Sequence, residues 1–377
     1  MQVKCKNNVF FITITAIVFF IIAVFCNNYI AFASACDFTI VVGSKTYSFS
    51  SSELGRYKDK TYLKCAEGVV DGIYYDTLIE PCNASVKFNP LSNEMFIIEK
   101  EKVGYQIDRE KLLSDIDSSL NSNVKTLKVS LNKVMPKITY QTIKNSTYET
   151  ASFSTYYGDS QPSRKHNIKL AVEKINGCVL GSGETFSFNQ VVGDRTEENG
   201  FQSSKVIENG VYVDGVGGGV CQVSTTLYNA ALLSGLEIIE RHQHSVMASY
   251  IEPSFDAMVS GNYSDFKFKN NTSGFVFIKG VCDGKNVAFT FYGLKPKYSY
   301  KRASKVIETY EPSGYEIIFD ETLKAGERVY SRFSKNGVKS EGYLQVYDNK
   351  GLIREKRLSV DKYKSVKGEI RVGTGKS

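Results

Sequence analysis

Short stretches in which apolar and polar residues alternate recur along the chain and predict β-strands with one face against a core. A different spacing follows Asp108, a residue type that caps helix N-termini, because Leu113, Ile116 and Leu120 share one helical face. The alternating stretches lie at Thr39–Val42, Ser85–Phe88, Met95–Ile98, Val124–Leu131, Tyr315–Phe319, Tyr343–Tyr347 and Leu352–Leu358. The pattern predicts an α+β protein of three mostly β-rich modules.

Two polar stretches, 145–163 and 295–312, are typical of linkers and set the expected module boundaries. The modules then cover residues 36–143, 149–293 and 312–377. In the central module, a glycine loop leads into a predicted helix, where Val223, Leu227 and Ala230 are near helical spacing and Gly235 supplies a C-terminal cap. Antiparallel strands are expected next, at 236–239 and 246–251.

The N-terminus predicts export from the cytoplasm. Lys4 and Lys6 precede an uncharged apolar run, Val9–Phe25, and Ala33-Ser34-Ala35 supplies small residues for cleavage. The run is at the lower limit of the length that crosses a bilayer. Residues 1–35 are therefore either a cleaved signal peptide or a retained membrane anchor, and the mature protein is expected to be extracytoplasmic.

Composition places the rest of the chain among ordinary globular proteins, with 42% hydrophobic and 23% charged residues. From Lys295 to the C-terminus the chain has 19 Lys and Arg against 11 Asp and Glu, within an overall net charge of +7. A basic tail suits an anionic surface such as a wall polymer or a membrane, or is simply a solvated face. Export argues against nucleic acid as the partner.

Eight cysteines are present, two of them in the targeting segment. None forms a CxxC pair or a Cys/His pair at zinc spacing, so neither a metal nor another cofactor is expected. Cys65 and Cys82 are candidates for a disulfide outside the cell. The Gly-rich run at 215–219 lacks the Gly-Lys-Ser/Thr of a phosphate-binding loop, which excludes that class of nucleotide site.

Cys221 comes two residues after the run Gly217-Gly218-Gly219 and is expected in the first turn of the predicted helix. Free N–H groups and the positive end of the helix dipole favour a thiolate there, which is how cysteine nucleophiles are commonly activated. A small buried hydrophobe is the competing interpretation of any single cysteine.

A cysteine nucleophile also needs a base, and the chain has only three histidines. His244 is the candidate base, His242 its possible substitute, and Asp256 the group that would orient the imidazole. The order Cys, His, Asp is also that of transglutaminase-like and NlpC-like cysteine enzymes. The candidate substrate-binding residues are Gly218, Gly219, Gln222, Arg241 and His242: the glycine loop could face an oxyanion, and Arg241 could clamp a carboxylate.

The central region resembles the VanW family. The motifs that carry this resemblance span about 130 residues and occur in order: Ser163-Arg164, Asn176-Gly177, Gly183-Glu184, Phe186–Asn189, Gly200-Phe201, Gly217–Ala230, Arg241 with His244-Ser245, Asp256–Val259 and Asp265–Phe268. Ser182 departs from the family pattern, which usually has Pro there. The family is named after an accessory protein of vancomycin-resistance clusters, so the resemblance implies a role at the cell wall but no defined reaction.

Two flanking resemblances point to the same setting. Gly104–Pro136 is similar to a peptidoglycan-binding domain, and Gly368–Thr374 with Asp320–Gly326 resembles the G-five domain, implicated in binding N-acetylglucosamine polymers. Two functions are therefore expected: a cysteine-dependent amidase or transpeptidase acting on peptidoglycan stem peptides, or a non-catalytic wall-binding or assembly protein. The expected partner in both cases is peptidoglycan or another wall glycopolymer, with the membrane as a further partner if the N-terminal segment is retained.

Overall fold

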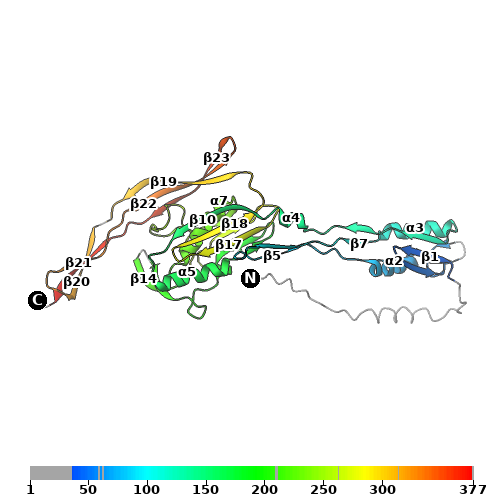
Figure 1. Ribbon diagram of the computed structural model, residues 1–377, viewed down its shortest axis with the longest axis horizontal. Helices are drawn as coiled ribbons and strands as arrows, with labels where there is room; N and C mark the ends of the chain where they lie inside the picture. The colour runs from blue at the N-terminus through cyan, green and yellow to red at the C-terminus, as the bar shows by residue number, and fades with distance from the viewer. Residues whose placement is uncertain are drawn as a thin grey trace. The chain divides into compact units, whose positions relative to one another are not determined.

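The computed structural model describes residues 36–57, 60, 61, 63–208, 211–261, 263–312 and 314–375 (Figure 1). The expected export segment lies outside these residues. Across the described ranges, no helix is long and apolar enough to cross a membrane. The fold is α+β and rich in strands, which confirms the predicted class. Its described part divides into two compact units, residues 36–85 with 99–139 and residues 86–98 with 140–375.

The first unit is a three-stranded sheet covered by two helices. Strand β1 (Phe38–Val42) lies between antiparallel β2 (Lys45–Phe49) and parallel β8 (Thr126–Val129). The predicted helix is α3 (Arg109–Asn121), and the Asp108 carboxylate accepts from the Lys111 backbone N–H. Its buried face uses Leu112, Ile116 and Leu120, and the predicted Leu113 is half-buried and packs against the same core. The other elements are α2 (Leu63–Thr77), β3 (Arg56–Tyr57), β4 (Lys60–Thr61), β7 (Gly104–Gln106) and β9 (Asn132–Val134).

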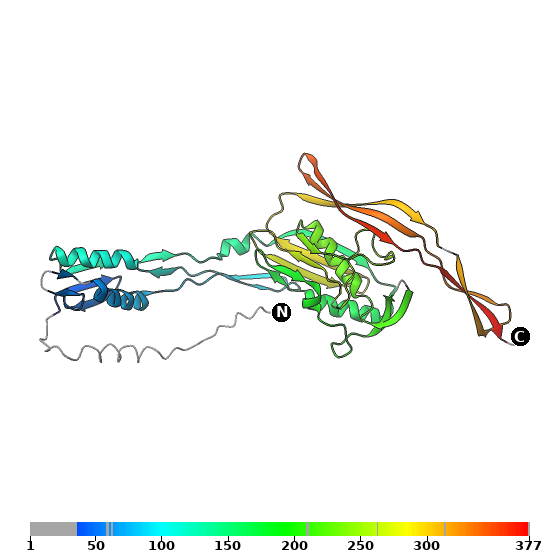
Figure 2. The same cartoon turned by 180° about the vertical axis from the view of Figure 1, so that it is seen from behind.

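The second unit is built around a four-stranded antiparallel sheet of order β10-β18-β17-β11. Helices α5 (Pro162–Ile175) and α7 (Val220–Leu233) pack on this sheet, as seen from behind in Figure 2. The strands are β10 (Tyr148–Tyr156), β11 (Val179–Leu180), β17 (Val276–Cys282) and β18 (Asn286–Gly293). Alternate residues of β18 are buried, so this face of the sheet and α7 share one apolar core.

Smaller elements surround that core. A second sheet has the order β12-β16-β15, and stacked Phe186 and Phe268 join β12 to β16. Phe88 and Phe96, from β5 and β6, pack against Phe277 of β17. The bounds are β5 (Ser85–Phe88), β6 (Phe96–Glu99), α4 (Tyr140–Lys144), β12 (Thr185–Ser187), α6 (Phe188–Val192), β13 (Ser203–Glu208), β14 (Val211–Val216), β15 (Glu237–Glu240) and β16 (Lys267–Lys269).

The C-terminal part of the second unit consists of two three-stranded sheets. In the first, β22 (Gly337–Asp348) lies between β19 (Ser299–Tyr310) and β23 (Gly351–Tyr363), all antiparallel. In the second, β24 (Gly368–Gly375) lies between parallel β20 (Tyr315–Lys324) and antiparallel β21 (Arg328–Arg332). Strand β23 leads directly into β24, so the two sheets are covalently continuous.

Several sequence expectations are wrong in detail. The expected linkers are largely structured, since 145–163 contains β10 and 295–312 contains β19. The backbone of each polar stretch is paired with a neighbouring strand of a sheet. Residues 246–251 form turns and bends and no strand. Cys65 and Cys82 are exposed free thiols. The helices α2 and α5 were not predicted, although Ala66, Val70 and Ile73 of α2 are buried at helical spacing.

Helix α7 begins where only glycine fits well. Gly219 is its N-cap and has a left-handed backbone with φ of 104°. A Cβ at this position would lie 2.9 Å from Ile168 Cγ1 and 3.1 Å from Arg164 Cγ, both on α5. The glycine therefore permits both the turn into α7 and the close approach of α5.

We expect Gly219→Ala to destabilise the protein by roughly 1–3 kcal/mol from backbone strain and by about 1–3 kcal/mol more from overlap with α5. Gly183→Ala is the matched control, since Gly183 also has a positive φ, 81°, but no atom lies within 4 Å of its added Cβ. Urea unfolding of the full chain measures both. Equal losses for the two variants would show that the contact with α5 is not tight.

Candidate functional site

Cys221 lies in the first turn of α7, as the second residue after the Gly219 cap. Its Sγ is 3.4 Å from the Val259 carbonyl oxygen, to which a thiol donates. The Val220 and Gln222 N–H groups are bonded to the Gly217 and Gly219 carbonyls, but the positive dipole end at this helix start still favours negative charge on sulfur. The local sequence thus places a thiol where its anion is stabilised.

Polar side chains of the otherwise apolar helix α7 hold the segment that carries Asp256. Asn229 Nδ2 donates to the Phe255 carbonyl at 2.8 Å, and the Ala257 N–H donates to Thr225 Oγ1 at 2.9 Å. The hydroxyl of Ser224 donates to the Ala257 carbonyl. These three bonds fix the backbone on both sides of Asp256, which explains why buried polar residues occupy a core helix.

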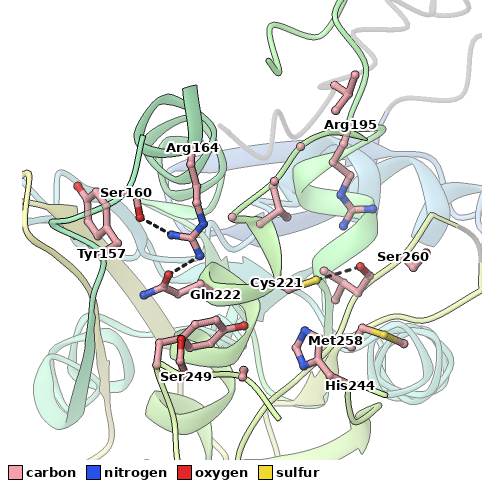
Figure 3. A pocket seen from close by; sticks show the side chains of 18 of the residues that line it. Tyr157, Ser160, Arg164, Arg195, Cys221, Gln222, His244, Ser249, Met258 and Ser260 are labelled. Carbon is pink, nitrogen blue, oxygen red and sulfur yellow. Dashed lines mark hydrogen bonds between the residues drawn. The ribbon is translucent and has the colours of Figure 1, made fainter. Parts of the chain in front are cut away.

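His244 and Asp256 are buried and hydrogen-bonded to each other. His244 Nδ1 is 2.6 Å from Asp256 Oδ2, and the His244 backbone N–H donates to the same oxygen at 2.6 Å. Because Nδ1 is held by the carboxylate, Nε2 is the nitrogen left for Cys221, whose thiol interacts with the His244 ring (Figure 3). The structure therefore brings Cys221, His244 and Asp256 together in one line.

The other oxygen of Asp256 is held by two further groups. Arg241 Nη2 and the Tyr363 hydroxyl both donate to Asp256 Oδ1 at 2.6 Å. Arg241 also donates from Nε to the Asp256 carbonyl and from Nη1 to Asp361 Oδ1, at 2.6 and 2.7 Å. Asp256 thus accepts four hydrogen bonds at its carboxylate, two on each oxygen.

A cavity of about 850 Å³ opens at the sulfur. Gly218, Gly219 and Gln222 line it together with Cys221 and His244. Arg164 and Arg195 also line it, and in Figure 3 they lie on the side of the sulfur opposite His244. Arg164 donates to Ser160 Oγ and Gln222 Oε1, each at 2.7 Å, and Arg195 donates to Asn189 Oδ1. The cavity is large enough for a peptide segment and carries positive charge.

The electrostatics favour a thiolate–imidazolium pair. Burial raises the pKa of the Cys221 thiol, but the hydrogen bond and charge of His244, with the charge of Arg195, lower it below its usual range. Burial lowers the pKa of His244, but the bonds to Asp256 and Cys221 raise it to about 10. Burial likewise raises the pKa of Asp256, whereas His244, Arg241 and Tyr363 lower it to about 2. The proton is therefore favoured on His244.

Two of the predicted substrate-binding residues lie outside the cavity wall. Arg241 is buried between Asp256 and Asp361, so it supports the carboxylate and does not line the cavity. His242 Nε2 pairs with Glu240 Oε1 at 2.9 Å, and its ring is not part of the cavity wall, so His242 is not the base. The two histidines would share one face on a regular strand. They do not, because residues 241–244 form a single β-bridge, at His242, in place of such a strand.

Sequence reasoning missed four residues of the site: Arg195, Tyr250, Asp361 and Tyr363. Arg195 and Tyr250 line the cavity, and burial raises the pKa of Tyr250. Asp361 and Tyr363 come from β23, more than 100 positions after Asp256. No local spacing connects such distant positions, so the sequence pattern carried no signal for Asp361 and Tyr363.

Comparisons with known proteins find two family models and two solved structures that are similar to parts of this chain. The family model "VanW like protein" matches residues 163–292, and "Putative peptidoglycan binding domain" matches residues 63–128. The G5 domain of an IgA1 protease is 20% identical, covering 22% of this chain and 94% of that domain, with a TM-score of 0.15. The HP0197 G5 domain is also 20% identical, covering 21% of this chain and 100% of that one, with a TM-score of 0.12.

Two relatives extend the match beyond the central region. The Enterococcus faecalis vancomycin B-type resistance protein VanW is 29% identical over 48% of this chain and 67% of its own length. An uncharacterised Bacillus subtilis protein, YoaR, is 33% identical over 59% of this chain and 76% of its own length. With the matched VanW segment containing Cys221, His244 and Asp256, the chain belongs to the VanW family.

Proposed function

We propose that this VanW-family protein is an extracytoplasmic, cysteine-dependent amidase or transpeptidase that acts on peptidoglycan stem peptides. The observation that carries the proposal is the line Cys221, His244, Asp256 at the wall of a peptide-sized cavity. Nucleophile, base and orienting carboxylate are the three parts that acyl transfer by a cysteine requires. No other set of groups in the described cavity wall combines a lowered thiol pKa with a hydrogen-bonded base.

The reaction follows from these positions. The Cys221 thiolate adds to an amide carbonyl carbon, and the carbonyl π electrons move to oxygen. When the oxyanion collapses, the C–N bond breaks, the leaving nitrogen takes the proton from His244, and a thioester remains. Water or a second amine then attacks, gives its proton to His244 and releases the thiolate. Water gives hydrolysis and an amine gives cross-linking. Asp256 holds the imidazole in the required tautomer throughout.

The surroundings support an anionic acyl donor. The positive dipole end at the start of α7 favours a developing oxyanion. Arg164 and Arg195 add two positive charges to the cavity, which suits a substrate with carboxylates, as peptide stems have. An amidase and a transpeptidase would share this mechanism and differ only in the acceptor, which is water for the amidase and an amine for the transpeptidase.

The setting is the cell wall. A peptidoglycan-binding segment matches residues 63–128, and a named relative belongs to vancomycin resistance. The N-terminal sequence supports export, with the mature chain either released to the wall or anchored in the membrane. Attachment by flanking parts would raise the local concentration of substrate at the cavity.

A second function, non-catalytic wall binding, is favoured by one surface. Tyr315 and Tyr330 are exposed on the second C-terminal sheet, and Phe333 is exposed just after β21. The rings of Tyr330 and Phe333 are parallel with centroids 6.1 Å apart. Flat exposed rings suit the apolar faces of sugars. This surface fits both functions, so the chemistry at Cys221 distinguishes them.

We expect purified protein to change peptidoglycan fragments and Cys221→Ala to abolish that change, because the nucleophile is lost. Cys178→Ala is the matched control: it removes another partly buried thiol of the same unit that does not line the cavity. Mass spectrometry of the fragments identifies both cleaved and newly joined stems. Identical fragments from wild type and Cys221→Ala would leave wall binding as the function.

A second expectation concerns the thiol itself. Iodoacetamide should modify Cys221 with an apparent pKa below the ordinary value of about 8.5, because His244 and Arg195 lower it. Reactivity should rise as pH passes the lowered thiol pKa. His244→Gln should move that rise to higher pH. Cys178 provides the internal comparison, since burial raises its pKa. Peptide mapping measures each site, and a Cys221 that reacts only at alkaline pH contradicts activation.

For wall binding, we expect Tyr330→Ala and Phe333→Ala each to weaken retention of the full chain on insoluble peptidoglycan by about fivefold, since a stacked ring contributes roughly 1 kcal/mol. Tyr148→Ala is the control, because Tyr148 is similarly exposed but lies on β10. Cosedimentation measures the bound fraction, and the basic charge adds a part that salt should remove. Unchanged retention of both variants would exclude this surface.

A further inference from the structure

The end of β23 is packed against the segment that carries His244. Gln243 Nε2 donates to the Lys362 carbonyl at 2.8 Å, and the Lys362 N–H donates to Gln243 Oε1 at 3.2 Å. The Lys364 N–H donates to the Ser245 carbonyl at 2.8 Å. His244 thus lies between two residues whose positions are fixed by the C-terminal strands.

Tyr363 extends from this strand to the carboxylate behind His244. It is only 1% exposed, and its hydroxyl donates to Asp256 Oδ1 at 2.6 Å while accepting from the Ser254 N–H at 2.8 Å. Ser254 is held a second time, by a 2.7 Å hydroxyl contact with Ser340 of β22. The C-terminal sheet therefore fixes both the carboxylate and the backbone two residues before it.

Asp361 acts on the same carboxylate through Arg241. Its Oδ1 accepts from Arg241 Nη1 at 2.7 Å, and its Oδ2 accepts from Ser359 Oγ at 2.6 Å. Arg241 then donates to both the side chain and the backbone carbonyl of Asp256. The Asp256 and Asp361 carboxylates are buried and the Arg241 side chain is only 10% exposed, so little solvent competes for the bonds between them.

We propose that the C-terminal strands complete the reaction site, with Tyr363 and Asp361 as positioning residues that fix Asp256 and, through it, the imidazole of His244. With Oδ1 held by Tyr363 and Arg241, only Oδ2 faces His244 Nδ1. Without those bonds the carboxylate can rotate, and the ring loses the orientation that directs Nε2 to Cys221. This inference rests on the proposed cysteine chemistry.

The test uses full-length Tyr363→Phe and Asp361→Asn, each of which retains the shape of its side chain. Tyr310→Phe is the matched control, because it removes a tyrosine hydroxyl of β19 that is bonded only to nearby Glu308. The readout is the rate of Cys221 alkylation against pH. The titratable and charged groups around the Cys221–His244 pair are Arg195, Tyr228, Arg241, Tyr250, Asp256, Asp361 and Tyr363.

We expect the apparent thiol pKa to rise by about one unit in both variants, which slows alkylation about tenfold at pH values below the pKa. Tyr310→Phe should match wild type. A merely structural contact would lower the melting temperature and leave the pH profile unchanged, and that result in both variants overturns the inference. So does failure of both variants to fold. If only Tyr363→Phe fails to fold, Asp361→Asn decides.

The two proposals fail differently. A wild-type Cys221 with an ordinary thiol profile rejects the cysteine chemistry, and the positioning role with it. An activated wild-type Cys221 whose profile survives both substitutions rejects the positioning role alone. Turnover of peptidoglycan by wild type and by both variants at equal rates would lead to the same second conclusion.

Discussion

The buried carboxylate of Asp256 is the group on which the arrangement of the site depends. A charge removed from water is costly unless hydrogen bonds and opposite charges replace its hydration. Asp256 has four donors, two on each oxygen, and a cation on either side in Arg241 and protonated His244. Removing any one donor leaves a buried lone pair unsatisfied, so segments far apart in sequence must arrive together for the carboxylate to be accommodated.

Helix α7 provides the rigid element for this arrangement. Its first turn carries Cys221, and Ser224, Thr225 and Asn229 bind the backbone around Asp256. Cys221 and the segment around Asp256 are thus both positioned by one helix, which keeps their separation constant as side chains move. The polar residues cost little in the core because each has a partner, and they explain a helix that is buried nearly all round yet not wholly apolar.

The sequence was informative where structure is local. Asp108 predicted the start of α3, and the three glycines before Cys221 predicted the start of α7, because caps and left-handed turns depend on adjacent residues. The grouping of Cys221, His244 and Asp256 followed from residue types and their order. Tyr363 and Asp361 could not be found this way, since their role arises from the packing of β23 on a loop. The segment 295–312 was misread for a related reason: it is polar, but it pairs along most of its length with β22.

The continuity of β23 with β24 constrains how the C-terminal strands can influence the chemistry. Tyr363 ends β23, and β24 begins at Gly368 beside the strands that carry Tyr315 and Tyr330. If a polymer bound to those rings, only a few residues of chain would separate its binding surface from Tyr363. Such a connection can switch the site only if the contact between Tyr363 and Asp256 has two alternative arrangements that polymer binds unequally. The Tyr363 hydroxyl is buried and hydrogen-bonded to two partners, and Tyr363 itself belongs to a paired strand. This contact therefore has one arrangement. Under the proposed function, the C-terminal strands would therefore hold substrate near a site that stays assembled and would not switch that site on.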